Sequence, residues 1–122
     1  MNERFPKSAR LLKRAEFRRT YDLGAATRNA GFHLFVRPRP EGGETRLGLT
    51  ATRAAGGSVA RNRLRRWARE AFRRLRPRVA PGQDMVANLH GRLARMPHAE
   101  FDRLFRDVLA KAHLLEPGET GP

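Results

Sequence analysis

The chain has 122 residues, of which 39% are hydrophobic, and a formal net charge of +14. This length predicts one domain over residues 1–122, with an ordered core at about 8–114 and flexible ends at 1–7 and 116–122. The absence of cysteine excludes a disulfide framework and a thiolate metal site, and fits a cytoplasmic protein. No apolar run approaches the ~18 residues of a membrane span, so we expect no membrane insertion.

The positive charge is concentrated in the first two thirds of the chain. Residues 1–79 hold 21 Lys and Arg against 6 acids, whereas residues 80–122 hold 5 against 6. Such a field attracts polyanions, either nucleic acid or an acidic membrane surface. Arginine provides 23 of the 26 basic residues, and its planar guanidinium grips phosphate and stacks on bases, which favours nucleic acid. A GC-rich genome would produce the same arginine bias.

The first predicted helix covers residues 13–23. Phe17 and Tyr21 lie one turn apart on the same face of it, and Gly24 is well placed as the residue after its end. Residues 1–12, which precede this helix, are predicted to be irregular.

Two predicted strands follow, at residues 31–37 and 46–53. In the first strand, Phe32, Leu34 and Val36 point to one side and more polar residues to the other. The link between the strands is rich in turn-forming residues, so an antiparallel hairpin is the simplest interpretation. We expect the apolar faces to pack on helices and the mixed faces to stay partly open.

The second half of the chain continues with a helix, a strand and a helix. The first of these helices has Ser58 as a plausible N-cap and ends at Pro77, the strand covers 84–89, and the last helix covers 97–115. With room for one extra short strand, this order predicts an α+β fold. The expected architecture is a two-layer α-β sandwich with helices on one side of a small mixed sheet.

The predicted helix after Ser58 combines a core face with a face of like charge. Leu64, Trp67, Ala68, Ala71, Phe72 and Leu75 follow helical spacing on the apolar side. The opposite side carries Asn62, Arg65, Arg66, Arg69, Arg73 and Arg76. Between Arg61 and Arg76 the helix holds eight arginines and a single acid, Glu70.

This arrangement opposes helix stability. Six arginine pairs stand at i+3 or i+4 spacing, and each costs roughly 0.2–0.5 kcal/mol on an exposed helix, about 1–3 kcal/mol together. Like-charged pairs that destabilise a helix without any structural gain are typical of a functional surface. A phosphate backbone is the matching partner, and Asn62 could read a base edge or a 2′-hydroxyl. The alternative is an ordinary solvated face in an arginine-rich protein.

The run VARNRLRRWARE, from Val59 to Glu70, resembles the signature of the bacterial ribonuclease P protein subunit. LLKRAEFRRTYDLG is similar to the first helix of that family, RLGLTATR to the strand before the signature, and GQDMVANL to the strand after it. The resemblance covers about residues 8–112 in order. The chain departs from the family pattern at Ala54, Gly57 and His90.

The resemblance implies a fold and a function. The fold is an α-β sandwich with a left-handed βαβ crossover, as in the ribosomal protein S5 domain 2-like fold. The protein subunit pairs with a large catalytic RNA, and the complex removes the 5′ leader of precursor tRNA with Mg²⁺ held mainly by the RNA. The resemblance thus implies catalytic RNA and precursor tRNA as partners; we predict no membrane partner and no obligate protein partner.

Two sets of site residues follow from the residues and the resemblance. The set predicted to bind the catalytic RNA is Arg61, Asn62, Arg63, Arg65, Arg66, Arg69 and Arg73. The set predicted to bind the single-stranded leader is Lys13, Arg14, Phe17, Tyr21, Phe35, Arg37 and Arg53. Aromatic rings beside cations form a stacking platform for unpaired bases. Phe17 and Tyr21 could equally be core residues, and Phe35 favours the core.

The sequence offers little for chemistry carried by the protein itself. The four histidines show no metal-ligand spacing, and no phosphate-binding or dinucleotide motif is present. We therefore predict no catalytic residue and no confident metal site in this chain. Two rival functions are a structural RNA binder such as a ribosomal protein, and a DNA binder that uses the basic helix in the major groove.

Overall fold

The computed structural model describes residues 7–115. Its main elements are α1 (Arg14–Leu23), β1 (Ala25–Arg28), β2 (Phe32–Pro38), β3 (Arg46–Ala51), α2 (Ser58–Leu75), β4 (Gln83–Leu89) and α3 (His98–Lys111). Short 3-10 turns occupy Lys7–Ala9, Arg53–Ala55, Arg76–Arg78 and Gly91–Arg95. The ends predicted to be flexible, 1–7 and 116–122, lie outside the described residues apart from residue 7.

The four strands form one mixed sheet in the order β1-β2-β4-β3. β2 is antiparallel to both β1 and β4, whereas β3 is parallel to β4. The predicted hairpin between the second and third strands is therefore wrong, because β4 lies between them. Met85, Val86 and Ala87 of β4 are fully buried, so this strand is apolar on both faces and takes a central position. α2 provides the long crossover that the parallel β3–β4 pair requires.

Strand β1 is the extra short strand for which the sequence left room. It reaches β2 through a turn in which Asn29 Oδ1 accepts hydrogen bonds from the N–H groups of Gly31 and Phe32, both at 3.0 Å. Most of its residues are exposed. Hydrophobic periodicity could not detect this strand, because its small residues bury no apolar face.

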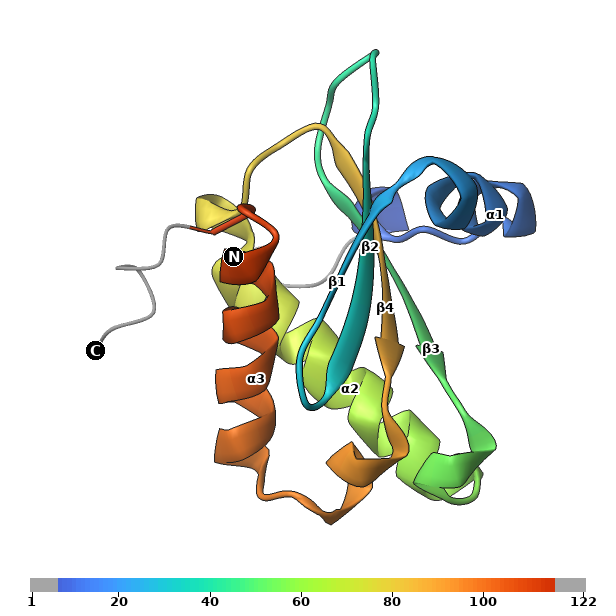
Figure 1. The fold of residues 1–122 in the computed structure, drawn as a ribbon, viewed down its shortest axis with the longest axis vertical. Helices are drawn as coiled ribbons and strands as arrows, with labels where there is room; N and C mark the ends of the chain where they lie inside the picture. The colour runs from blue at the N-terminus through green and yellow to red at the C-terminus, as the bar shows by residue number, and fades with distance from the viewer. Residues whose placement is uncertain (1–6, 116–122) are drawn as a thin grey trace.

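The helices cover both faces of the sheet, which corrects the expectation that they lie on one side. α2 and α3 cover one face, and α1 crosses the other (Figure 1). On the α1 side, Phe35, Val86 and Gly48 form one row across the three strands. This row is apolar enough to need cover, and Phe17 and Tyr21 of α1 provide it.

The core between the sheet and the α2–α3 layer is aromatic at its centre. Phe32 of β2 packs edge-to-face on Phe101 and Phe105 of α3, with ring centroids 5.2 and 5.4 Å apart. All three rings are fully buried. Within residues 7–115, no helix combines the length and apolarity needed to cross a bilayer.

The boundaries of two helices differ from the sequence prediction. Ser58 is the first residue of α2, and Gly57 takes the N-cap position with no side-chain cap. The chain turns sharply at Gly56, whose φ of 117° belongs to the region that favours glycine. α3 ends at Lys111 rather than 115. This part of the fold nevertheless presents the two faces of α2 as predicted.

Candidate nucleic-acid interface

The apolar face of α2 is packed as the helical spacing predicts. Leu64, Ala68 and Phe72 are fully buried, and Ala71 and Leu75 are nearly so. Trp67 is half-buried at the edge of the same face. With this side fixed in the core, the charged side of the helix must face outward.

We call the outward side of α2 the arginine face. It comprises Arg61, Asn62, Arg63, Arg65, Arg66, Arg69 and Arg73. Asn62, Arg66 and Arg69 are exposed, and the other members are half-buried. The structure therefore brings all seven residues of the first predicted set onto one surface.

Some members of the arginine face are held by neighbouring groups. Arg65 donates to Asn62 Oδ1 at 3.0 Å, and Arg73 donates to Glu70 at 3.0 Å. Arg63 donates to the Ala94 carbonyl at 3.1 Å and lies 5.3 Å from the centre of the Trp67 ring. Arg63 is thus partly an anchor for the loop before α3, whereas Arg66 projects freely within the described part of the chain.

The crowding of like charge is visible in the ionisation of Arg69. Burial lowers the pKa of its guanidinium, and the positive charges of Arg10 and Arg65 lower it further. Arginine stays protonated at neutral pH even so. The nearby charges of Arg10 and Arg65 make the site electropositive, so an anion placed there would be stabilised.

A second surface, the sheet groove, lies on the α1 side of the sheet. We define it by Tyr21 of α1, His33 and Phe35 of β2, Thr50 of β3 and Asn88 of β4. The Tyr21 ring meets Phe35 edge-on with centroids 4.9 Å apart, and His33 lies 4.4 Å from Phe35. Tyr21 is 37% exposed. Aromatic rings thus gather on a surface that solvent can reach.

Phe17 belongs to both the core and this surface. Its ring lies over Gly48, where an added Cβ would come within 2.5 Å of Phe17 Cζ. The residue is half-buried. Phe17 therefore sets the distance between α1 and the sheet while the residue stays partly exposed. This placement is compatible with both a core residue and a leader contact.

The cations of the predicted leader-binding set do not form one cluster. Lys13 and Arg14 are exposed at the start of α1, and Arg53 is exposed just after β3. Arg37 is different, since its side chain is only 14% exposed and lies 3.6 Å from the Asp84 carboxylate. Arg37 is thus placed in a buried ion cluster, away from the open part of the groove.

Asp84 is the centre of that cluster. It is 1% exposed and accepts hydrogen bonds from Arg39 at 2.7 Å and from Arg46 at 2.8 Å. Arg46 also reaches Glu16 of α1 at 3.1 Å. Burial alone would raise the pKa of Asp84, but the hydrogen bonds from Arg46 and Arg39 outweigh it and lower the pKa. The cluster ties α1 to the sheet.

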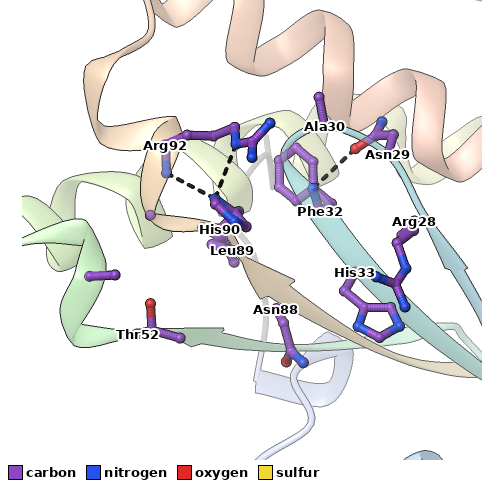
Figure 2. Close-up of a pocket in the computed structure, with 12 residues that line it drawn as sticks. Arg28, Asn29, Ala30, Phe32, His33, Thr52, Asn88, Leu89, His90 and Arg92 are labelled. Atoms are coloured by element: carbon purple, nitrogen blue, oxygen red, sulfur yellow. Dashed lines mark hydrogen bonds between the residues drawn. The ribbon is translucent and has the colours of Figure 1, made fainter.

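An open pocket of about 490 Å³ lies beside the sheet groove (Figure 2). Its lining includes Arg28, His33, Asn88, His90 and Arg92. The sequence prediction assigned none of these residues to a binding set. Arg28 lies on the short strand β1 and Arg92 in the turn after β4, neither of which was predicted, whereas Asn88 lies within the predicted strand 84–89. His90 Nδ1 accepts hydrogen bonds from the backbone N–H and the side chain of Arg92, at 3.1 and 3.3 Å.

Two acids of α3, Asp102 and Asp107, are held in structural contacts. Asp102 pairs with Arg74 at 3.2 Å, and Asp107 accepts from Asn29 at 3.1 Å. Within residues 7–115 no three His, Asp or Glu side chains gather in a way that could hold a metal ion. The surfaces that this part of the chain presents are suited to binding an extended polyanion.

Comparisons with known proteins identify the family of this chain. The family model described as Ribonuclease P matches residues 5–113. A ribonuclease P protein component from Geobacillus kaustophilus (strain HTA426) is 35% identical over 112 residues, which are 92% of this chain and 93% of that protein. One from Burkholderia pseudomallei (strain 1106a) is 42% identical over 98 residues, which are 78% of this chain and 70% of that protein.

Solved structures share the fold. A mutant RNase P protein from Staphylococcus aureus superposes with a TM-score of 0.85 at 25% identity, covering 89% of this chain and 92% of that chain. The RNase P protein from Thermotoga maritima gives a TM-score of 0.76 at 27% identity, covering 84% and 96%. The chain therefore belongs to the ribonuclease P protein family, whose members are the protein component of the ribonucleoprotein endoribonuclease of tRNA 5′ processing.

Proposed function

We propose that this chain binds the catalytic RNA of ribonuclease P through the arginine face of α2 and the unpaired 5′ leader of precursor tRNA through the sheet groove. In this way it assists the Mg²⁺-dependent removal of the leader. The single observation that carries the proposal is the arginine face, where Asn62, Arg66 and Arg69 are exposed and four more arginines are half-buried beside them, on a helix whose other side is buried.

The arginine face suits a folded RNA. Its cations lie on a rigid helix that is fixed by the core, so binding orders little beyond the side chains. Each phosphate contact releases counterions, and several contacts together give strong, salt-dependent binding. The RNA would also offset the charges of Arg10 and Arg65, which add to the effect of burial in lowering the pKa of Arg69. A bound polyanion thus offsets the electrostatic repulsion within the arginine face of the free protein.

The sheet groove suits an unpaired strand. Tyr21, Phe35 and His33 offer ring faces and edges, each stacked base being worth about 1–3 kcal/mol. Arg53 stands exposed near the end of β3, and Lys13 and Arg14 at the start of α1. A duplex presents no free base faces, so this groove selects single-stranded RNA.

The protein's own residues bind and orient in this scheme. Two carboxylates on the α1 side of the sheet, Glu16 and Asp84, are both engaged by Arg46. These residues do not fit a divalent cation, so we assign Mg²⁺ to the RNA, where it would supply activation of the attacking water. No step of the reaction is assigned to a side chain of this chain.

The direct test is reconstitution with a bacterial ribonuclease P RNA. We expect the chain to restore cleavage of precursor tRNA at a low Mg²⁺ concentration at which the RNA alone is inactive. The affinity of the complex for precursor tRNA should exceed its affinity for tRNA without a leader. Equal affinities would contradict the groove assignment and favour a purely structural RNA binder, while failure to assemble would contradict the arginine-face assignment.

A further inference from the structure

Asn88 occupies a distinctive position in the sheet groove. By strand register it stands in one row with His33 of β2 and Thr50 of β3, on the face that α1 crosses. It is half-buried and lines the open pocket. Figure 2 shows the Asn88 and His33 side chains on the same side of the sheet. Asn88 is therefore a polar group with Thr50 on one side of it in the row and the His33 ring on the other.

Two hydroxyl groups contact the Asn88 amide. The Tyr21 hydroxyl donates to Asn88 Oδ1 at 2.9 Å, and the Thr50 hydroxyl donates to the same oxygen at 2.5 Å. Both acceptor sites of this oxygen are thus used. The amide nitrogen Nδ2 has no hydrogen-bond partner among the described residues, and its two N–H groups remain available to a ligand.

The rings beside Asn88 are positioned to hold a base. His33 lies against Phe35, and Tyr21 contributes its edge to the same group. Burial and the nearby Arg28 guanidinium lower the pKa of His33, so its ring is neutral at pH 7 and acts as an aromatic surface rather than as a cation. A base resting on these rings would present its edge toward the row that contains Asn88.

We propose that Asn88 is a specificity-determining residue that donates a hydrogen bond from Nδ2 to an acceptor atom on the edge of an unpaired base. The inference rests on the proposed function, because it requires the leader to lie in the sheet groove. It also restricts the mode of contact. The bidentate pairing of asparagine with adenine requires the amide oxygen as an acceptor, and here that oxygen is already occupied.

The competing explanation is that Asn88 only fastens α1 to the sheet through Tyr21. Two variants separate these roles. Asn88→Ala removes both the anchor and the donor. Asn88→Asp keeps an oxygen for the Tyr21 and Thr50 hydroxyls but has no N–H, and its negative charge weakens RNA binding equally for every base.

The experiment measures binding of the reconstituted complex to precursor tRNAs that carry each of the four bases, or an abasic residue, at successive leader positions. With the wild-type protein we expect a difference of about 2- to 10-fold between bases at one position, the range of a single hydrogen bond. Both variants should reduce this difference to within 2-fold. Each variant should also change the affinity for the leader that is abasic at that position, and this fold-change gives the part of its effect that does not depend on the base.

Each outcome bears on a different proposal. If deleting the leader leaves affinity unchanged, the proposed function fails before Asn88 is tested. If the leader contributes but Asn88→Asp discriminates among bases as the wild-type protein does, the anchor explanation holds and the inference is overturned. Circular dichroism and thermal unfolding of both variants establish that the fold is retained.

Discussion

Phe17 rests directly on Gly48, so the distance between α1 and the sheet is set by the absence of a side chain on β3. A Cβ at position 48 would come 2.5 Å from Phe17 Cζ and 3.2 Å from Leu11 Cβ. The position of the Phe17 ring beside the sheet groove is therefore set by a buried glycine. This contact connects the packing of the molecule to the surface that we assign to the leader.

Gly48→Ala should displace the Phe17 ring and disturb the groove. We expect a loss of about 1–3 kcal/mol in the free energy of unfolding, as for other overpacked sites, together with weaker leader-dependent binding of precursor tRNA. Gly57→Ala is the comparison for an added methyl group, because its Cβ meets nothing within 4 Å, and it should cost only what alanine costs in place of glycine at the N-cap of α2. Leader-dependent affinity that survives in Gly48→Ala at wild-type strength would show that Phe17 does not shape the groove.

Sequence reasoning was most successful for α2. The spacing of Leu64, Ala68 and Phe72 predicted the buried side of this helix, and the structure confirms it. The arginines were then placed outward by geometry alone. This worked because a helix with one strongly apolar stripe has only one orientation that buries it.

The sheet was harder to predict because strand neighbours are chosen by long-range packing. The turn-rich link between β2 and β3 satisfied every local rule for a hairpin, yet β4 separates them. Only the buried run from Met85 to Ala87 signals a central strand, and periodicity does not say which strands lie beside it. The position of α1 depends on the row formed by Phe35, Val86 and Gly48, which does not exist until that strand order is known.

The difference between Arg37 and Arg53 shows why the environment of each predicted leader-binding residue could not be derived from the sequence. Both are arginines at or near strand ends, and both were predicted to bind the leader. The structure places Arg37 beside the buried Asp84 and leaves Arg53 exposed. A buried acid that gathers three arginines has no signature in a single sequence, since its partners lie on separate strands and loops.

Replacing arginines on the arginine face should reduce the salt dependence of RNA binding. We expect the double variant Arg66→Ala and Arg69→Ala to lower the slope of log affinity against log salt by about 0.7–0.9 for each lost phosphate contact. The fold should become slightly more stable, because like-charged pairs are removed. Arg103→Ala on α3 is the control, and it should leave the slope unchanged. An unchanged slope in the double variant would remove this surface from the RNA interface.

Tyr21 should contribute to leader binding mainly through its ring. Tyr21→Ala removes a stacking surface, and we expect a loss of about 1–3 kcal/mol in leader-dependent binding. Tyr21→Phe keeps the edge-on contact with Phe35 and loses only the hydrogen bond to Asn88, so its loss should be smaller. Equilibrium binding of precursor tRNA with and without its leader distinguishes them. Equal losses in both variants would assign the effect to the hydroxyl.

Asp84→Asn should destabilise the fold because it leaves Arg39 and Arg46 without their buried partner. We expect a loss of about 3 kcal/mol in the free energy of unfolding at neutral pH, the lower end for a broken buried pair, since Arg46 keeps Glu16 as a partner.

The pKa of Asp84 is lowered in the folded protein. Its ionised form therefore stabilises the fold above the ordinary aspartate pKa of about 3.9, and this contribution is lost as the pH falls through the lower folded value. Denaturant unfolding across pH should show a constant gap between the wild-type protein and Asp84→Asn above about pH 5, and a narrowing gap below about pH 4. Glu100→Gln, at an exposed pair with Arg103, provides the surface comparison, and a gap of the same size for both variants would mean that the Asp84 cluster adds nothing beyond a surface pair.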